Sequence, residues 1–133
     1  MADDSELDYV RTFLNKVHTV MTFKSFSEAR VITAINDTQR GLVYPPELMS
    51  ATDNYTIKRF DVLLSETTEA NLTTAISNIL LGIKKLNRRE AITTYTRPAA
   101  LCNIKLMKGT KAFEQGTTKR WNQTITLDIM WSV

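Results

Sequence analysis

The residues of this chain that could do catalytic chemistry are few and stand apart from one another. The 133 residues contain one histidine, His18, and one cysteine, Cys102. His18 follows Val17 in an expected helix, with no acid or nucleophile at a recognisable spacing, so we interpret it as a surface or half-buried residue rather than a general base. Cys102 falls on the expected dry face of a strand, where a thiol behaves as a small hydrophobe. We therefore predict no catalytic residue and no enzymatic activity.

Cofactor and metal sites are not indicated by the sequence either. The chain has only four glycines, and it lacks a Gly-rich phosphate loop, a cluster of metal-ligating residues and a G-x-S-x-G elbow. The lone cysteine excludes an internal disulfide and a cysteine-rich zinc site. We expect no cofactor, no metal and no small-molecule substrate. An enzyme whose carboxylates are brought together from distant positions is kept as the third alternative.

The composition is that of an ordinary globular domain. Hydrophobic residues make up 43% of the chain and charged residues 23%, and the net charge is +3. The acidic N-terminus lacks the apolar stretch of a secretory signal, and the longest apolar run, Ile79 to Ile83, is too short to cross a bilayer. We expect one domain over residues 1–133, inside the cell and without membrane contact.

The clearest structural pattern lies in residues 121–133. Apolar residues occupy every odd position except Gln123, and most of the even positions between them are polar. Alternation with a period of two predicts a strand with one dry face, which here carries Trp121 and Trp131 near its two ends. This strand either closes the core of the domain or completes a surface for another subunit.

Two segments have the spacing of amphipathic helices. The first is predicted from about Leu7 to Met21, after a capping Ser5. The second opens after residues 65–69, which supply caps and acids, and its apolar stripe is Leu72, Ile76, Ile79, Ile83 and Leu86, with Ala75 and Leu80 beside it. Its end carries Lys84, Lys85, Arg88 and Arg89, which we interpret as offsetting the helix dipole rather than as a phosphate-binding patch.

Three further segments, residues 30–35, 56–64 and 99–108, predict strands. Residues 36–55 contain Gly41 and the pair Pro45 and Pro46, and they predict a long loop or an edge segment. Residues 109–116 predict the tip of a hairpin. The expected fold is α+β, a two-layer sandwich in which a mostly antiparallel sheet of four to five strands is packed by two helices in the order α-β-(loop)-β-α-β-β.

Two groups of residues are candidates for interaction with a partner. In the loop from Gly41 to Asn54 we expect exposed apolar side chains, and we expect the loop to be mobile in a free subunit and ordered on assembly; these residues are Leu42, Val43, Tyr44, Leu48 and Met49. The hairpin tip is basic and carries Lys108, Lys111, Lys119 and Arg120. A solvated loop is the favoured interpretation of this tip, and non-specific contact with DNA phosphates is the other.

The passage from Phe60 to Leu86, a strand that leads into a long helix, and the ending from Trp121 to Trp131 resemble the tail-terminator and tail-completion proteins of long-tailed bacteriophages. The resemblance implies a viral structural protein that forms a homo-oligomeric ring, usually of six subunits. Such a ring sits on the last ring of tail-tube protein, stops its polymerisation and presents a surface to the head-connector protein. It implies a location in the tail or neck of the virion after assembly in the host cytoplasm, with possible contact to the DNA that passes through the ring.

One feature departs from that family, in which a proline commonly just precedes an inner strand. Here the proline pair leads into Leu48 and Met49 and then into polar residues, which argues against the strand expected there. The alternative function is a small non-enzymatic nucleic-acid-binding or regulatory α+β module. The aromatic signature of an RNA-recognition sheet is absent from the expected middle strands.

Overall fold

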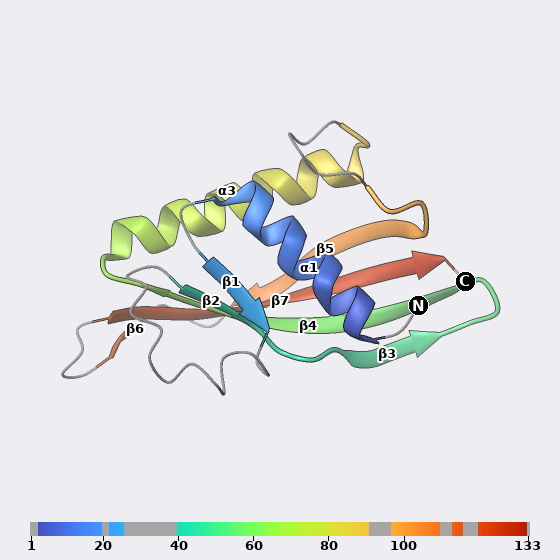
Figure 1. Cartoon of the computed structure of the whole chain (residues 1–133), viewed down its shortest axis with the longest axis horizontal. Helices are drawn as coiled ribbons and strands as arrows, with labels where there is room; N and C mark the ends of the chain where they lie inside the picture. Colours follow the sequence, from blue (N-terminus) through green and yellow to red (C-terminus); the bar gives the residue numbers. More distant parts are fainter. Residues whose placement is uncertain are drawn as a thin grey trace.

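The computed structural model describes residues 3–19, 22–25, 40–90, 97–109, 113–115 and 120–132. These residues form two helices and seven strands (Figure 1). In chain order the elements are α1 (Asp3–Val17), β1 (Thr22–Ser25), β2 (Arg40–Val43), β3 (Glu47–Ala51), β4 (Tyr55–Glu66), α3 (Glu69–Asn87), β5 (Leu101–Gly109), β6 (Phe113–Gln115) and β7 (Arg120–Ser132).

The described strands form one sheet in the order β1-β2-β4-β7-β5. β2 and β3 lie one after the other along one edge of β4, and β5 and β6 do the same along β7. The β1–β2 pair is parallel and every other pair is antiparallel. The expected mostly antiparallel sheet is confirmed, with more strands than the sequence pattern predicts.

β4 and β7 form the centre of the sheet. They pair without interruption from Tyr55 opposite Ser132 to Glu66 opposite Trp121. The even residues of β4 and the odd residues of β7 point into the core, where Phe60 and Leu127 are fully buried opposite each other. The prediction that Ile125, Leu127 and Ile129 face the helices is confirmed.

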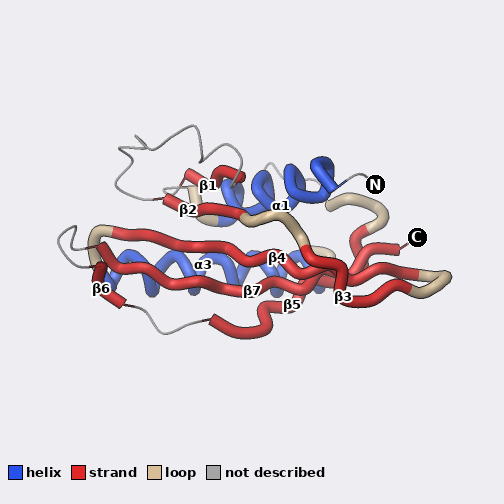
Figure 2. Tube along the Cα trace, turned by 90° about the horizontal axis from the view of Figure 1, so that it is seen from below, coloured by secondary structure: helices blue, strands red, loops and turns tan. Residues whose placement is uncertain are grey.

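Both helices pack on the same face of the sheet, and the opposite face is covered by neither of them (Figure 2). The α+β two-layer architecture is therefore confirmed. α3 begins after Thr68, whose hydroxyl accepts a hydrogen bond from the Asn71 N–H at 3.1 Å. α1 ends at Val17, one turn before the predicted Met21.

The predictions for the irregular segments need correction. Residues 36–55, expected as a long loop or an edge segment, contain β2 and β3, so the strand that the proline pair argued against is present. The edge alternative is confirmed for β3, which pairs with β4 alone, whereas β2 lies between β1 and β4. The tip expected over residues 109–116 contains β6, which pairs with the start of β7. Cys102 is exposed rather than on the dry face, because β5 shifts register between Leu101 and Asn103 and the alternation changes phase there. The strand predicted at residues 30–35 lies outside the described residues.

Candidate interaction surfaces

The hairpin formed by β3 and β4 is the most exposed structured part of the described chain. All five residues of β3 are exposed, and the side chains of Leu48 and Met49 are 59% and 42% accessible. The Thr52 hydroxyl closes the turn, because it accepts hydrogen bonds from the N–H groups of Asn54 at 3.2 Å and Tyr55 at 3.1 Å. Both views show this hairpin extending beyond the helices (Figures 1 and 2). It is a regular arm with two large apolar side chains in solvent.

The other residues predicted to be exposed in this region are not. Val43 is fully buried, and Leu42 and Tyr44 are half-buried. The expectation was wrong because β2 belongs to the sheet, with Val43 opposite Val62 and Leu42 opposite Leu63. The candidate surface in this segment therefore reduces to Leu48 and Met49.

The predicted basic tip is described only in part. Lys108 lies near the end of β5, opposite Thr126, and Arg120 begins β7, opposite Gln115. Lys111 and Lys119 lie outside the described residues. Whether these four residues meet a partner stays a prediction.

Two asparagines from the helices complete the outer edges of the sheet. The Asn15 side chain of α1 accepts from the Phe23 N–H at 2.9 Å and donates to the Phe23 carbonyl at 3.3 Å. The Asn87 side chain of α3 does the same at Ile104, at 2.9 Å and 2.7 Å. Each amide thus takes the place of a neighbouring strand on β1 or β5, and such coverage opposes edge-to-edge pairing.

Arg97 extends the coverage of β5, since its guanidinium donates to the carbonyls of Leu101 at 2.7 Å and Cys102 at 3.0 Å. In the described part of the chain, β3 has no comparable side chain on its outer edge. Sequence reasoning missed these contacts, because an asparagine on a helix carries no sign of the strand end that it will meet.

The outward surface of α3 is the second exposed apolar surface. Leu80 and Leu81 are 38% and 53% accessible, so the prediction that Leu80 belongs beside the buried stripe is wrong. One turn further on, the exposed Lys84 and the half-buried Lys85 follow, and Arg88 and Arg89 close the helix. The Arg88 N–H bonds to the Lys84 carbonyl at 3.1 Å, which fixes the end of the helix. The basic residues therefore extend directly from the two leucines.

The sheet face opposite the helices is polar along its centre. Arg59 donates to both carboxylate oxygens of Asp128, at 2.8 Å and 3.0 Å, and this hydrogen bonding raises the pKa of Arg59. The Thr126 hydroxyl donates to Asp61 at 2.8 Å. These cross-strand pairs hold β4 and β7 in register.

His18 is buried rather than at the surface or half-buried as predicted, with 3% of it accessible. Its Nδ1 lies 3.0 Å from Nδ2 of Asn78, which joins the end of α1 to α3. Burial lowers the pKa of the imidazole, because the charged form loses its hydration. With an amide as the neighbour of its Nδ1, His18 is placed to connect the helices.

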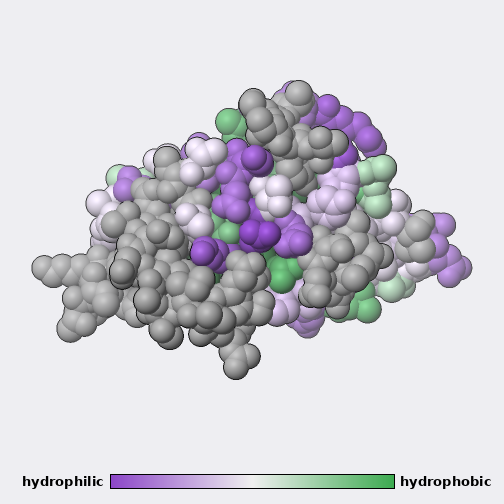
Figure 3. All heavy atoms as spheres, in the orientation of Figure 1, coloured by the Kyte–Doolittle hydropathy of each residue, from purple (hydrophilic) through white to green (hydrophobic). Residues whose placement is uncertain are grey.

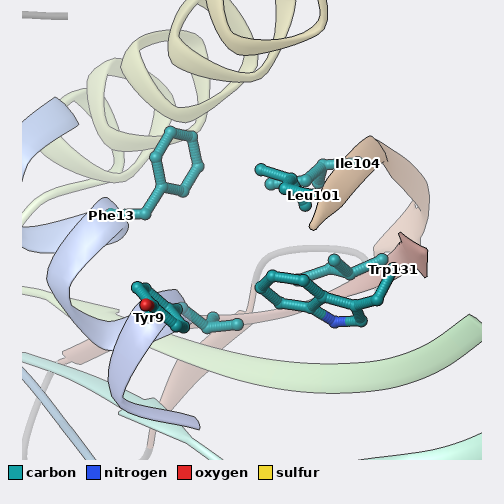
Figure 4. Close-up of a pocket in the computed structure, with 7 residues that line it drawn as sticks. Tyr9, Phe13, Leu101, Ile104 and Trp131 are labelled. Atoms are coloured by element: carbon teal, nitrogen blue, oxygen red, sulfur yellow. The ribbon is translucent and has the colours of Figure 1, made fainter. Parts of the chain in front are cut away.

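A small cavity lies between α1 and the ends of β5 and β7 (Figure 4). Its volume is about 10 Å³, enough for roughly one water molecule. The labelled side chains that surround it are Tyr9, Phe13, Leu101, Ile104 and Trp131. Tyr9 and Trp131 meet with ring centroids 5.8 Å apart. The cavity is a packing gap in the aromatic end of the core.

Among the described residues, no group of three or more histidine, cysteine or acidic side chains is arranged to hold a metal ion. No described helix combines the length and the apolar character needed to span a bilayer.

The fold has a counterpart among solved structures. A chain of the structure titled "Virion of native gene transfer agent (GTA) particle" matches 99% of this chain over 92% of its own length, with a TM-score of 0.57 and 9% sequence identity. At this identity the match establishes a shared fold. No protein-family model and no curated protein matches the sequence.

Proposed function

We propose that this protein is a structural subunit of a phage-like particle and has no enzymatic role. The observation that carries the proposal is the fold shared along nearly the whole length of both chains with a component of a gene transfer agent virion. The arm-like hairpin and the exposed leucines of α3 support it, because a subunit that works by assembly needs surfaces for neighbours rather than a catalytic centre.

Within that class, the proposed role is that of a tail terminator or tail-completion protein. Copies of the chain form a ring, of six subunits in the family that the sequence resembles, on the last ring of the tail tube. The ring stops the growth of the tube and offers its other side to the head connector. The whole chain acts as one domain in this role.

The test is assembly with the tail-tube protein of the same particle. Purified chain is added while tail tubes polymerise, and tube length and tube ends are examined by negative-stain electron microscopy. The expected result is shorter tubes with an extra ring at one end, and the control is the chain unfolded by heat before addition. Normal tube lengths with bare ends would refute the terminator role.

DNA contact is a separate part of the proposal. If the basic hairpin tip faces the DNA path, replacing Lys108, Lys111 and Lys119 together by glutamine leaves folding unchanged and lowers particle yield in a salt-dependent manner. Unchanged yield across a range of salt would assign these lysines to solubility. The nucleic-acid-binding module has less support, since the centre of the open sheet face is occupied by the Arg59–Asp128 and Asp61–Thr126 pairs.

A further inference from the structure

The face of the sheet that the helices leave open carries a row of alternating charges. Residues that pair directly across an antiparallel sheet share one face, and four such residues form this row. From β3 through β4 and β7 to β5, its members are Glu47, Arg59, Asp128 and Lys105. Figure 2 looks onto this face, with β4 and β7 in front of α3. Hydrophilic residues also gather over α1 (Figure 3), so the order of the charges, rather than polarity alone, distinguishes the open face.

Pairing within one molecule accounts for the middle of this row and leaves its ends unpaired. Arg59 donates to both carboxylate oxygens of Asp128, at 2.8 Å and 3.0 Å. The pKa of Arg59 is raised mainly by Asp128 and less by Glu47. Glu47 and Lys105 are exposed, and neither forms an ion pair with another residue of the described chain. The row therefore ends in an acid on β3 and in a base on β5.

The other basic residue of this part of β4 belongs to the opposite face. Lys58 forms an ion pair with Glu6 of α1, and 2.7 Å separates Nζ from Oε2. Leu48 pairs with Lys58, so its side chain also lies on the helix side of the sheet. The charged row on the open face is thus neutral as a whole, with two acids and two bases.

The rows on either side of the charged row are matched in the same way across β4 and β7. On one side Ile57 lies opposite Met130, and both side chains are half-buried. On the other side Asp61 lies opposite Thr126, whose hydroxyl donates to it at 2.8 Å. A second copy that presents its β7 to β4, and its β4 to β7, therefore meets a matching residue in each of the three rows.

A two-fold axis that runs parallel to the strands, midway between β4 and β7, produces this arrangement. It reverses the order of the strands in the second copy and keeps the rows level. Glu47 then faces Lys105 of the second copy, and Arg59 faces Asp128 of the second copy. A two-fold axis that runs across the strands along the row would instead bring Glu47 against Glu47. The order of the charges therefore favours a second copy as the occupant of this face and determines its direction.

We propose that two copies of this chain pair through their open sheet faces about the axis that runs parallel to the strands. Sheets stack face to face about 10 Å apart, with one layer of side chains from each sheet between them. Beside the charged row, Ile57 packs against Met130 of the second copy. Such a contact is isologous and is complete with two copies, whereas a ring needs a heterologous contact. The pair is therefore a state of the free chain, separate from the ring of the proposed function.

Sedimentation equilibrium of the free chain measures the stoichiometry. We expect monomers and dimers in equilibrium without larger species, and a dissociation constant that rises with salt because the outer charges are screened. A chain that stays monomeric, or one that grows beyond the dimer, would overturn the proposal. Rings formed by the free chain would overturn it while supporting the proposed function. A dimer that leaves tail tubes uncapped would support this contact and refute the terminator role alone.

Charge reversal tests which residues face each other. Glu47→Lys and Lys105→Glu are each expected to weaken dimerisation by roughly tenfold or more, because each variant places like charges at both ends of the row. In an equal mixture, the two variants should form a heterodimer about as tight as the parent dimer, since opposite charges face each other again at both ends. The matched controls are Asp53→Lys and Lys84→Glu, at exposed positions outside the row, which should leave dimerisation unchanged. A mixture that associates no more tightly than either variant alone would exclude the proposed pairing of Glu47 with Lys105.

An apolar substitution on each side of the sheet tests which face forms the contact. Met130→Thr keeps a residue suited to a strand but removes the contact with Ile57 of the second copy, so we expect dimerisation to weaken by roughly tenfold. The matched control is Leu48→Thr, since Leu48 is exposed on the helix side of the sheet, and it should dimerise like the parent. Circular dichroism of the monomers checks that both variants are folded. Equal effects of the two substitutions on dimerisation would refute the assignment of the contact to the open face.

Discussion

Replacing Asn87 by alanine tests whether a helix side chain completes the outer edge of the sheet. The substitution removes two hydrogen bonds, one to the Ile104 carbonyl at 2.7 Å and one from the Ile104 N–H at 2.9 Å. Each such bond contributes about 0.5–1.5 kcal/mol to stability, and replacing asparagine by alanine returns roughly 0.5 kcal/mol of helix propensity. Because Asn87 is exposed at the end of α3 and water can take its place in part, we expect a net loss of about 1–2 kcal/mol.

This loss of unfolding free energy corresponds to a decrease in the melting temperature. The entropy of unfolding is about 2.1 cal/mol/K per residue near 60 °C, so for 133 residues 1 kcal/mol corresponds to about 3.5 °C. Asn87→Ala should melt about 4–7 °C below the parent in differential scanning calorimetry. The matched control is Asn103→Ala, an exposed asparagine on β5 itself, for which we expect a change close to zero.

Hydrogen exchange gives a second measurement of the same contact. The Ile104 amide should be protected in the parent and in Asn103→Ala, and it should exchange faster in Asn87→Ala because its acceptor is gone. A variant with unchanged melting temperature and unchanged exchange at Ile104 would show that water satisfies this strand edge as well as Asn87 does, and the reasoning would be wrong.

Three further perturbations address the interior. Leu127→Ala should cost about 2–5 kcal/mol in chemical denaturation, since Leu127 is fully buried, whereas Leu81→Ala should cost under about 0.5 kcal/mol; equal losses would contradict the assigned strand face. Gly82→Ala places a Cβ 2.4 Å from Cγ1 of Val17, so we expect a loss of about 1–3 kcal/mol, partly recovered by adding Val17→Ala, and additive effects would argue against the clash. Burial lowers the pKa of His18 below its unfolded value of 6.5, so the folded state binds fewer protons than the unfolded state. The contribution of neutral His18 to the free energy of unfolding is therefore complete above pH 6.5 and is lost as the pH falls toward the lowered pKa. The fall in the free energy of unfolding between pH 8 and pH 5 should be smaller in His18→Gln than in the parent. An identical pH profile for the two proteins would contradict a lowered pKa of His18 in the folded state.

The elements that the sequence predicts best are those whose own pattern decides their structure. β4, α3 and β7 have long, regular apolar periods, and their bounds fall within a few residues of the predicted ones. β2 and β3 were missed because Pro45 and Pro46 lie between them and because several residues of the two strands are polar. Their strand conformation follows from the long edge that β4 offers, which is a tertiary effect.

Side-chain surroundings are less predictable than elements. The face of Cys102 depends on an irregularity in pairing between Leu101 and Asn103, for which the sequence carries no signal. The exposure of Leu48 and Met49 was predicted from their place among polar residues, whereas the exposure of Leu80 on α3 was not, since its position fits a buried stripe equally well.

The place of β7 in the sheet has a consequence for synthesis. It is the last of the described elements in chain order, yet it lies between β4 and β5. Arg59 and Asp128, which face each other across the central pair, are 69 positions apart. At about 5–20 residues per second, a ribosome takes roughly 3–14 s to make that stretch. During this time β4 has no β7 to pair with. Folding of the central sheet is therefore tied to the synthesis of β7, and a chain that ends before β7 would expose the apolar side of β4 to chaperones and proteases.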